Sequence, residues 1–269
     1  MADNNENSGS AASRALPWYD YQPGVPVPKH ITHMRVGVQQ ALVAAQKGTA
    51  PEIMELPNQL CRQHSNLQQV QIHVHTVEVT PSYAFGQCQQ LKQVEFVAST
   101  TGQSDIAEAT RNRPVQPRLT MIDYKAFYYC PNLHSVIGLE HVSQSLKRIG
   151  ISAFGNCGKL TTLNLSCLTR LDSLGDAAFA YCESLTVVDL SNCVMVKCIG
   201  ESAYQNCKAL KLFISLPIWK GLETSLSRVP CTGEHSHPEL VETKELESFG
   251  IALAWHKSHV SPHDFCSPH

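Results

Sequence analysis

Residues 153–165 read AFGNCGKLTTLNL, and residues 178–190, which begin 25 positions later, read AFAYCESLTVVDL. In both stretches alanine, phenylalanine and cysteine have the same offsets, and three aliphatic residues follow at matching positions. A phrase that recurs at a fixed step of roughly 20 to 50 residues predicts a repeat architecture, in which each copy is one structural unit. The same phrase occurs elsewhere in the chain.

Six copies align on one anchor position, which is a cysteine in five copies and a histidine in the weaker first copy. The anchors are His64, Cys88, Cys130, Cys157, Cys182 and Cys207, at intervals of 24, 42, 27, 25 and 25 residues. A leucine lies three positions after every anchor: Leu67, Leu91, Leu133, Leu160, Leu185 and Leu210. An aromatic residue lies three positions before each cysteine anchor: Phe85, Phe127, Phe154, Phe179 and Tyr204. We predict that the cysteines, their leucines and their aromatics form the structural core of the repeat.

Each copy combines two local patterns. The segment after the anchor, L-x-x-V-x-L, ends in the alternation that predicts a strand with one buried face. The segment before it, I-G-x-x-A-F-x-x-C, opens with a turn residue and then spaces its apolar residues as a short helical turn would. One such unit cannot bury its apolar side alone, so the copies must stack and share a continuous core. The sequence therefore predicts an α/β solenoid with a parallel strand ladder.

The repeated phrase resembles the BspA-type leucine-rich repeat, which usually reads L-x-x-I-G-x-x-A-F-x-x-C-x-x-L-x-x-V-x-L. The resemblance covers residues 52–217 in six copies. It implies a curved, right-handed leucine-rich-repeat solenoid whose strand ladder lines the concave face. It also implies a binding or scaffolding role without catalysis.

The segments outside the repeats suggest caps, a loop and tails. Residues 1–25, rich in Asn, Ser, Ala and Pro, predict a disordered arm. In residues 26–51, HITHMRV predicts a capping strand and residues 38–50 a helix. The polar stretch 97–118 explains the long interval as a loop insert, which is either neutral or a clamp over the ligand face. We predict C-terminal capping helices in residues 218–255 and a histidine-rich tail in residues 256–269.

The recurring cysteines are most simply small buried hydrophobic residues rather than redox or metal-binding groups. The tail places His256, His259, His263, Cys266 and His269 close together. Imidazole and thiolate are zinc ligands, but these spacings match no recognised site. We therefore predict no metal and no cofactor, while a metal-binding or redox-responsive protein that uses the tail or the thiols stays as a third hypothesis.

Charge and composition exclude several classes of function. The formal net charge is −2 and the pI about 6.7, which argues against general nucleic-acid binding. No apolar run approaches the length of a membrane span, and the N-terminus lacks the pattern of a secretory signal. The common phosphate-binding and hydrolytic motifs do not occur, so we predict a non-catalytic, soluble intracellular protein.

The exposed positions of the predicted ladder carry the functional hypothesis. The two residues that flank the central apolar position of each strand point away from the core. As candidate binding residues on the concave face we select Gln93, Glu95, Thr162, Asn164, Val187 and Asp189. Amides, hydroxyls and scattered aliphatic residues with few charges fit a protein or peptide partner. The alternative is a cell-surface or adhesion protein of the same repeat type.

Overall fold

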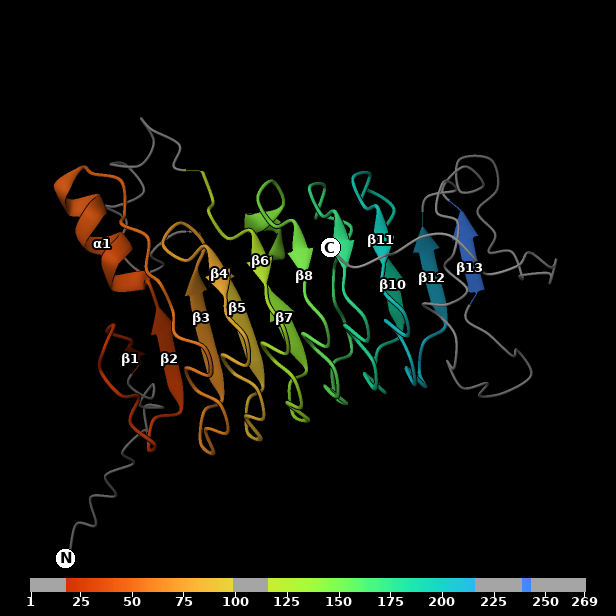
Figure 1. Cartoon of the computed structure of the whole chain (residues 1–269), viewed down its shortest axis with the longest axis horizontal. Coiled ribbons are helices and arrows are strands. Elements are labelled where there is room, and N and C mark those ends of the chain that lie inside the picture. Colours follow the sequence, from red (N-terminus) through yellow and green to blue (C-terminus); the bar gives the residue numbers. More distant parts are fainter. Residues whose placement is uncertain (1–17, 99–115, 216–238, 243–269) are drawn as a thin grey trace, which may run out of the picture.

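The structure, a computed structural model, describes residues 18–98, 116–215 and 239–242, with residues 212–215 and 239–242 described by their backbone only. Figure 1 shows that the chain winds into a row of coils stacked side by side. Each copy of the repeat forms one coil. Strands from successive coils pair in parallel, so residues far apart in the sequence lie next to one another.

The strands predicted after the anchors belong to the first of two ladders, which we call the main ladder. Its members are β1 (Tyr19–Asp20), β2 (His33–Val36), β3 (Gln69–His73), β5 (Gln93–Val97), β7 (Ser135–Ile137), β10 (Val187–Asp189), β12 (Leu212–Ser215) and β13 (Glu239–Glu242). Of these, β1, β2 and β13 extend the ladder at its ends. β1, β2, β3, β5 and β7 form one parallel sheet, and β10, β12 and β13 form another. Between them, Thr162 makes a parallel bridge to Ser135, so the coil that follows β7 joins the same ladder.

A second ladder of two-residue strands, the short ladder, lies behind the first (Figure 1). Its members are β4 (Val79–Thr80), β6 (Met121–Ile122), β8 (Arg148–Ile149), β9 (Ser173–Leu174) and β11 (Cys198–Ile199), paired in this order. These strands come just before the turn residue of the repeated phrase. The sequence predicted one strand in each unit, and the structure adds this second one.

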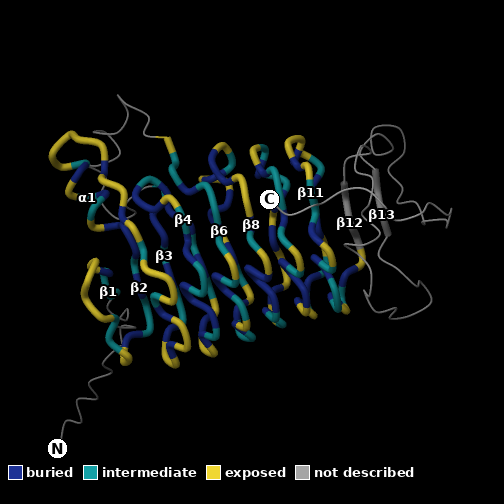
Figure 2. The backbone as a smooth tube through the Cα atoms, viewed as in Figure 1, coloured by how far each residue is buried: buried dark blue, intermediate teal, exposed yellow. Residues whose placement is uncertain are grey.

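The register aligns equal positions of the repeat. Val94 in β5 pairs with Val136 in β7, and Val188 in β10 pairs with Phe213 in β12. Because the same slot recurs in every coil, each apolar slot becomes a continuous column inside the stack. Figure 2 shows this buried interior between more exposed edges.

The column of aromatic residues is the clearest of these. Successive rings stack nearly in parallel, with centroid distances of 5.4, 5.1, 5.6 and 5.5 Å from Phe85 through Phe127, Phe154 and Phe179 to Tyr204. The anchor cysteines and their leucines lie in the same hydrophobic core. Contacts between coils therefore recur at every step of the stack.

The segment before each anchor forms consecutive turns, which we call the turn segment. In one coil Ser152 and Asn156 have left-handed backbone conformations, with φ of 52° and 62°. Alternate N–H groups donate to the next coil, as Phe127 N does to Ala153 O at 2.8 Å. A helix would instead direct these groups to carbonyls of its own coil. The expected short helical turn is replaced by turns for this reason.

The N-terminal end of the stack requires one correction. The predicted arm extends to residue 25, yet β1 pairs with β2 and Tyr21 is only 3% exposed. The boundary at residue 25 is therefore wrong, and residues 1–17 lie outside the described part of the chain. The strand expected in HITHMRV is β2, and the helix expected in residues 38–50 is α1 (Val38–Lys47). A short 3-10 helix, η1 (Leu139–Val142), follows β7.

The C-terminal prediction is wrong at one place. Helices were expected in residues 218–255, but β13 is a strand that pairs in parallel with β12 and continues the main ladder. The other residues of that range and the histidine-rich tail lie outside the described residues. Within the predicted insert 97–118, residues 99–115 also lie outside the described part of the chain. Its first residue, Val97, is instead the last residue of β5 and is buried. No helix in the described residues has the length and apolarity to cross a membrane.

A buried histidine at the end of β3 makes stability depend on pH. His73 is 3% exposed, and within the described residues its Nδ1 has no hydrogen-bond partner. Burial, and to a lesser extent the neighbouring His75, lowers the pKa of His73 from 6.5 to about 3. The unfolded chain therefore binds a proton at this residue at a higher pH than the folded chain does. The contribution of the neutral His73 side chain to the stability of the fold is fully present above pH 6.5 and is lost as the pH falls toward 3.

We expect the free energy of unfolding to fall by about 2 kcal/mol from this residue between about pH 7.5 and about pH 5. In His73→Gln this part of the pH dependence disappears, because the group that takes up the proton is gone. His30→Gln, at an exposed position, is the matched control for the general effect of a histidine-to-glutamine substitution. Denaturant unfolding at several pH values measures this change in the free energy of unfolding. Equal slopes for His73→Gln and the wild type would contradict the prediction.

Candidate functional site

The outward-pointing side chains of the main ladder form one continuous surface, which we call the ladder face. It consists of His33, Arg35, Gln69, Gln71, Gln93, Glu95, Ser135, Ile137, Thr162, Asn164, Val187 and Asp189. Parallel pairing places equal slots beside one another, as in the pairs Gln71 with Glu95 and Glu95 with Ile137. All six candidate binding residues lie on this face. Thr162, Asn164 and Val187 are exposed, whereas Gln93, Glu95 and Asp189 are half-buried.

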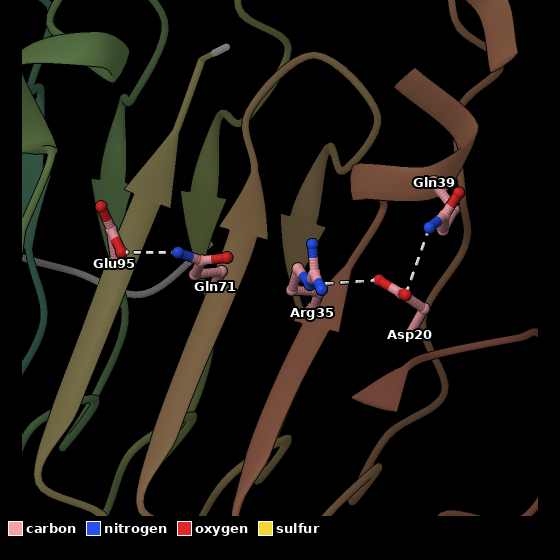
Figure 3. A network of polar contacts seen from close by, with 5 residues as sticks. All are labelled: Asp20, Arg35, Gln39, Gln71 and Glu95. Atoms are coloured by element: carbon pink, nitrogen blue, oxygen red, sulfur yellow. Dashed lines mark hydrogen bonds and ion pairs between the residues drawn. The ribbon is translucent and has the colours of Figure 1, made fainter. Parts of the chain in front are cut away.

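A polar network occupies the N-terminal end of the ladder face (Figure 3). The Asp20 carboxylate lies 3.4 Å from Nε of Arg35 and accepts a hydrogen bond of 3.2 Å from the Gln39 amide. One strand further, the Gln71 amide donates to the Glu95 carboxylate at 2.9 Å. Arg35 and Asp20 thus form an ion pair, and Gln71 and Glu95 a hydrogen bond, so these polar groups have partners within the chain.

Sequence reasoning missed Asp20 because it assigned residues 1–25 to an arm, and with it the partner of Arg35, a residue of the predicted capping strand. The guanidinium of Arg35 also lies 5.5 Å from the Trp18 ring centroid, and Trp18 packs edge-on against His33. The signal was present in the sequence, since three aromatic residues fall within Trp18–Tyr21. Such a cluster is unusual for a disordered segment, which is generally poor in aromatic residues.

Two of the candidate residues have a local structural role. The Asn164 side-chain oxygen accepts hydrogen bonds from Ser166 N at 3.2 Å and Ser166 Oγ at 2.8 Å. The Asp189 carboxylate accepts one from Ser191 N at 2.9 Å. Both follow the sequence pattern [ND]-L-S, in which an Asn or Asp side chain bonds the backbone two residues on. Asn164 and Asp189 therefore stabilise the turn that leaves the ladder.

The middle of the ladder face is the part with exposed apolar surface. Ile137 and Val187 are 42% and 40% exposed, although both belong to strands. Thr162 lies in the coil between them and is also exposed. An aliphatic and hydroxyl surface at this point offers contacts that the charged N-terminal end does not.

The anchor cysteines form a ladder of thiol hydrogen bonds inside the core. The Sγ atoms of Cys130, Cys157 and Cys182 each lie 3.2 Å from the carbonyl of the aromatic residue in the preceding coil. Cys88 donates in the same way to the Cys61 carbonyl at 3.0 Å. A cysteine here fills a small apolar space and also donates to a buried carbonyl, a contact that a purely aliphatic residue cannot make.

Burial makes these thiols poor nucleophiles. It raises the pKa of Cys130, Cys157 and Cys182 well above the ordinary value of 9.0. For Cys88 the pKa rises to about 12 from the same cause. Because the thiolate is the reactive and metal-binding form, the environment of the anchors favours a structural role. Among the described residues no group of three or more His, Cys, Asp or Glu side chains is placed to hold a metal ion.

We expect iodoacetamide to distinguish the anchors from the half-buried Cys167 in the native protein at about pH 8. Burial also raises the pKa of Cys167, but its side chain is accessible and it reacts within the experiment. Cys157 and Cys182 are fully buried, with their pKa well above 9.0, and react only after unfolding. Mass spectrometry of the alkylated peptides gives the extent at each site. The same reaction in denaturant is the control, in which all three alkylate. Alkylation of Cys157 in the folded protein as fast as that of Cys167 would show the interpretation to be wrong.

Comparisons with known proteins agree with the repeat architecture. A family model for a BspA-type leucine-rich repeat region, in six copies, matches residues 51–107 and 112–223. Among solved structures, a leucine-rich repeat protein from Bacteroides ovatus is similar with a TM-score of 0.51 and 16% identity over 80% of this chain. The match covers 47% of that protein, so this chain spans about half its length. A search of curated proteins found no match.

Two further solved structures have lower TM-scores. A leucine-rich repeat protein from T. pallidum gives a TM-score of 0.41 and 24% identity, over 55% of this chain and 58% of that one. A leucine-rich cell surface protein from Faecalibacterium prausnitzii gives 0.36 and 19%, over 72% of this chain and 48% of that one.

Proposed function

The chain belongs to the BspA-type leucine-rich-repeat family, and from that premise we propose that it is a non-catalytic scaffold that binds a protein or peptide through its ladder face. The observation that carries the proposal is the exposure of two aliphatic side chains, Ile137 and Val187, on the ladder face. Every recurring slot of the repeat serves the core, the turn segment or the ladder. The ladder is the part of the repeat that we defined by its outward-pointing side chains, so we expect a partner to bind on the ladder face.

The chemistry of the face supports a protein partner over a polyanion. Exposed aliphatic side chains next to hydroxyls and amides are typical of protein recognition surfaces. At the N-terminal end Arg35 forms an ion pair with Asp20, and the Glu95 carboxylate accepts a hydrogen bond from Gln71, so no free cationic patch is formed by these residues. We place the contact on Ile137, Thr162 and Val187, with Gln93 and Glu95 at its edge. Asn164 and Asp189 contribute by fixing the turns.

Affinity capture with matched lysine variants tests this proposal. Val187→Lys puts a charge in the middle of the proposed contact, and Val194→Lys puts the same charge at a position that is 60% exposed and outside the ladder face. We expect a partner to be recovered with the wild type and Val194→Lys, and to fall by about tenfold or more with Val187→Lys. Thermal unfolding establishes that the three proteins are equally folded.

The capture is performed on both the cell extract and the cell-surface fraction. Because we propose an intracellular scaffold, the partner is expected in the extract. A partner found only in the surface fraction would support the alternative of an adhesion protein. Equal recovery with Val187→Lys and Val194→Lys would exclude the ladder face as the binding surface.

A further inference from the structure

A second surface of the stack lies on the turn segments, at the residue that follows the turn residue in each copy. We call it the turn row; its members are Ser82, Tyr124, Ile151, Asp176 and Glu201. All of them except Ser82 are exposed. Along the stack the side chains change from polar and aromatic through aliphatic to acidic. The row therefore has two ends of different chemistry.

Backbone hydrogen bonds between the coils keep the row in register. The residue after each member donates its N–H to the carbonyl of the next member: Tyr83 N to Tyr124 O at 3.0 Å, and Lys125 N to Ile151 O, Ser152 N to Asp176 O and Ala177 N to Glu201 O, each at 2.9 Å. The same contact thus joins every pair of neighbouring members. The five members follow one another in regular steps, and Ile151 is the middle one.

Two cations lie at the N-terminal end of the row. Nζ of Lys125 lies 4.8 Å from the ring centroid of Tyr124 and 5.6 Å from that of Tyr83. Cζ of Arg62 lies 4.5 Å from the same Tyr83 ring, so this side chain reaches the coil of Ser82 although it belongs to the coil before. A hydrogen bond with Tyr124 raises the pKa of Lys125, and the ammonium is therefore charged at neutral pH.

These two positive charges have no ionic partner in the described part of the chain, where neither Arg62 nor Lys125 belongs to an ion pair. Arg62 donates instead to the uncharged amide oxygens of Gln59 and Gln87, at 3.3 and 3.2 Å. The one acidic residue in the turn segments of these coils, Asp123, is half-buried and already accepts a hydrogen bond of 2.7 Å from a serine hydroxyl. This end of the row therefore favours an anionic partner.

The C-terminal end of the row carries the opposite charge. Asp176 and Glu201 are exposed, and neither forms an ion pair with another described residue. A hydrogen bond of 2.9 Å from Glu201 N to Oδ1 of Asp176 fixes this carboxylate with respect to the row. Counted from Ile151, the two acids lie one and two steps toward the C-terminal end. The cations Lys125 and Arg62 lie one and two steps toward the other end, so the charges are antisymmetric about Ile151.

From this antisymmetry we propose that the turn row binds the turn row of a second copy of this chain, which runs antiparallel to it around a two-fold axis at Ile151. Such a pairing is isologous, so each contact occurs twice. Lys125 of one chain then faces Asp176 of the other, and Arg62 faces Glu201. The two Ile151 side chains, each 46% exposed in the single chain, bury apolar surface at the centre.

The dimer is expected to be weak and sensitive to salt. The turn row is a narrow strip along five coils, so the contact belongs to the small, transient class of protein interfaces. Ion pairs between exposed side chains are screened by salt, and we expect dimers at low salt and monomers at about 1 M salt. The turn row precedes the anchors and the main ladder follows them, so this pairing does not use the ladder face.

Sedimentation equilibrium with charge-reversal variants tests the proposal. Lys125→Glu and Asp176→Lys each place like charges opposite one another at both symmetric contacts. We expect the association constant of either variant to fall by about tenfold or more. An equimolar mixture of the two variants restores dimers, because both contacts of the mixed dimer then join opposite charges. A variant that had merely lost its fold would not be restored by mixing.

Lys92→Glu is the matched control. This exposed lysine precedes β5 and lies outside the turn row, so its reversal leaves the association constant unchanged. The proposal is overturned if the wild type stays monomeric at every concentration, if the single variants dimerise as the wild type does, or if their mixture stays monomeric. Assemblies larger than a dimer would exclude a closed two-fold pairing. Dimers that Val187→Lys abolishes and Lys125→Glu preserves would place the contact on the ladder face instead.

Discussion

Replacing Phe154 with alanine is expected to lower the free energy of unfolding by about 4 kcal/mol. The ring is 1% exposed and stacks between Phe127 at 5.1 Å and Phe179 at 5.6 Å. Truncation removes the ring from the middle of the aromatic column and leaves a cavity between the Phe127 and Phe179 rings. In a solenoid each coil contacts only its neighbours, so the two halves of the stack lose cohesion at this point. Denaturant unfolding at equilibrium measures the change.

The control for this variant is Ile151→Ala in the same coil. Ile151 is 46% exposed, and truncating it is expected to change the free energy of unfolding by less than about 1 kcal/mol. The comparison separates the effect of the aromatic column from the general effect of removing an apolar side chain. Similar losses for Phe154→Ala and Ile151→Ala would mean that the column does not hold the coils together.

Gly175→Ala is expected to cost about 3 kcal/mol, although it adds one methyl group. A Cβ at this position would lie 2.5 Å from Ile151 N and 2.6 Å from the Gly150 carbonyl carbon. Both are backbone atoms of the preceding coil, so the contact can be relieved only by moving one coil away from the other. The loss therefore spreads to the hydrogen bonds of the neighbouring short ladder, which β8 and β9 form.

Gly158→Ala is the matched control for Gly175→Ala. A Cβ at Gly158 meets no atom within 4 Å. Alanine there restricts the unfolded chain without straining the folded one, and it is expected to leave stability unchanged or to raise it by up to about 1 kcal/mol. The two variants thus differ in sign as well as in size. If thermal unfolding gave the same small shift for both, the close approach of the coils at Gly175 would be refuted.

The repeated phrase was sufficient to predict the architecture because periodicity is a property of the sequence itself. Phe154 and Phe179, or Cys157 and Cys182, fall at equal offsets, and stacking then follows from the need of each unit to bury its apolar side. The position of the main ladder and its outward-pointing residues followed from the alternation in L-x-x-V-x-L.

Features that depend on contacts between coils were harder to predict. The spacing of apolar residues before Cys157 fits a helical turn equally well, and only the hydrogen bonds to the next coil exclude it. The roles of Asn164 and Asp189 were missed for a different reason. Their slot was correctly interpreted as outward-facing, but the [ND]-L-S pattern in the same residues, a local turn signal, was not used.

At the ends of the stack the repeated phrase is absent and no longer predicts the structure. Residues Trp18–Tyr21 belong to no copy of the phrase, and proline-rich composition nearby outweighed their aromatic content. β13 likewise contains only a short run, ELVE, which carries too little periodicity to separate a strand from a helix. Its pairing with β12 decides between them.

Site-specific photo-crosslinking in intact cells tests most directly whether the ladder face is the binding surface. A photoreactive residue is placed at Val187 on the ladder face, and the same residue is placed at Val194 outside it. We predict a discrete crosslinked protein adduct from position 187 and none from position 194, since only the first lies in the proposed contact. An adduct that forms at position 194 and not at position 187 would contradict it.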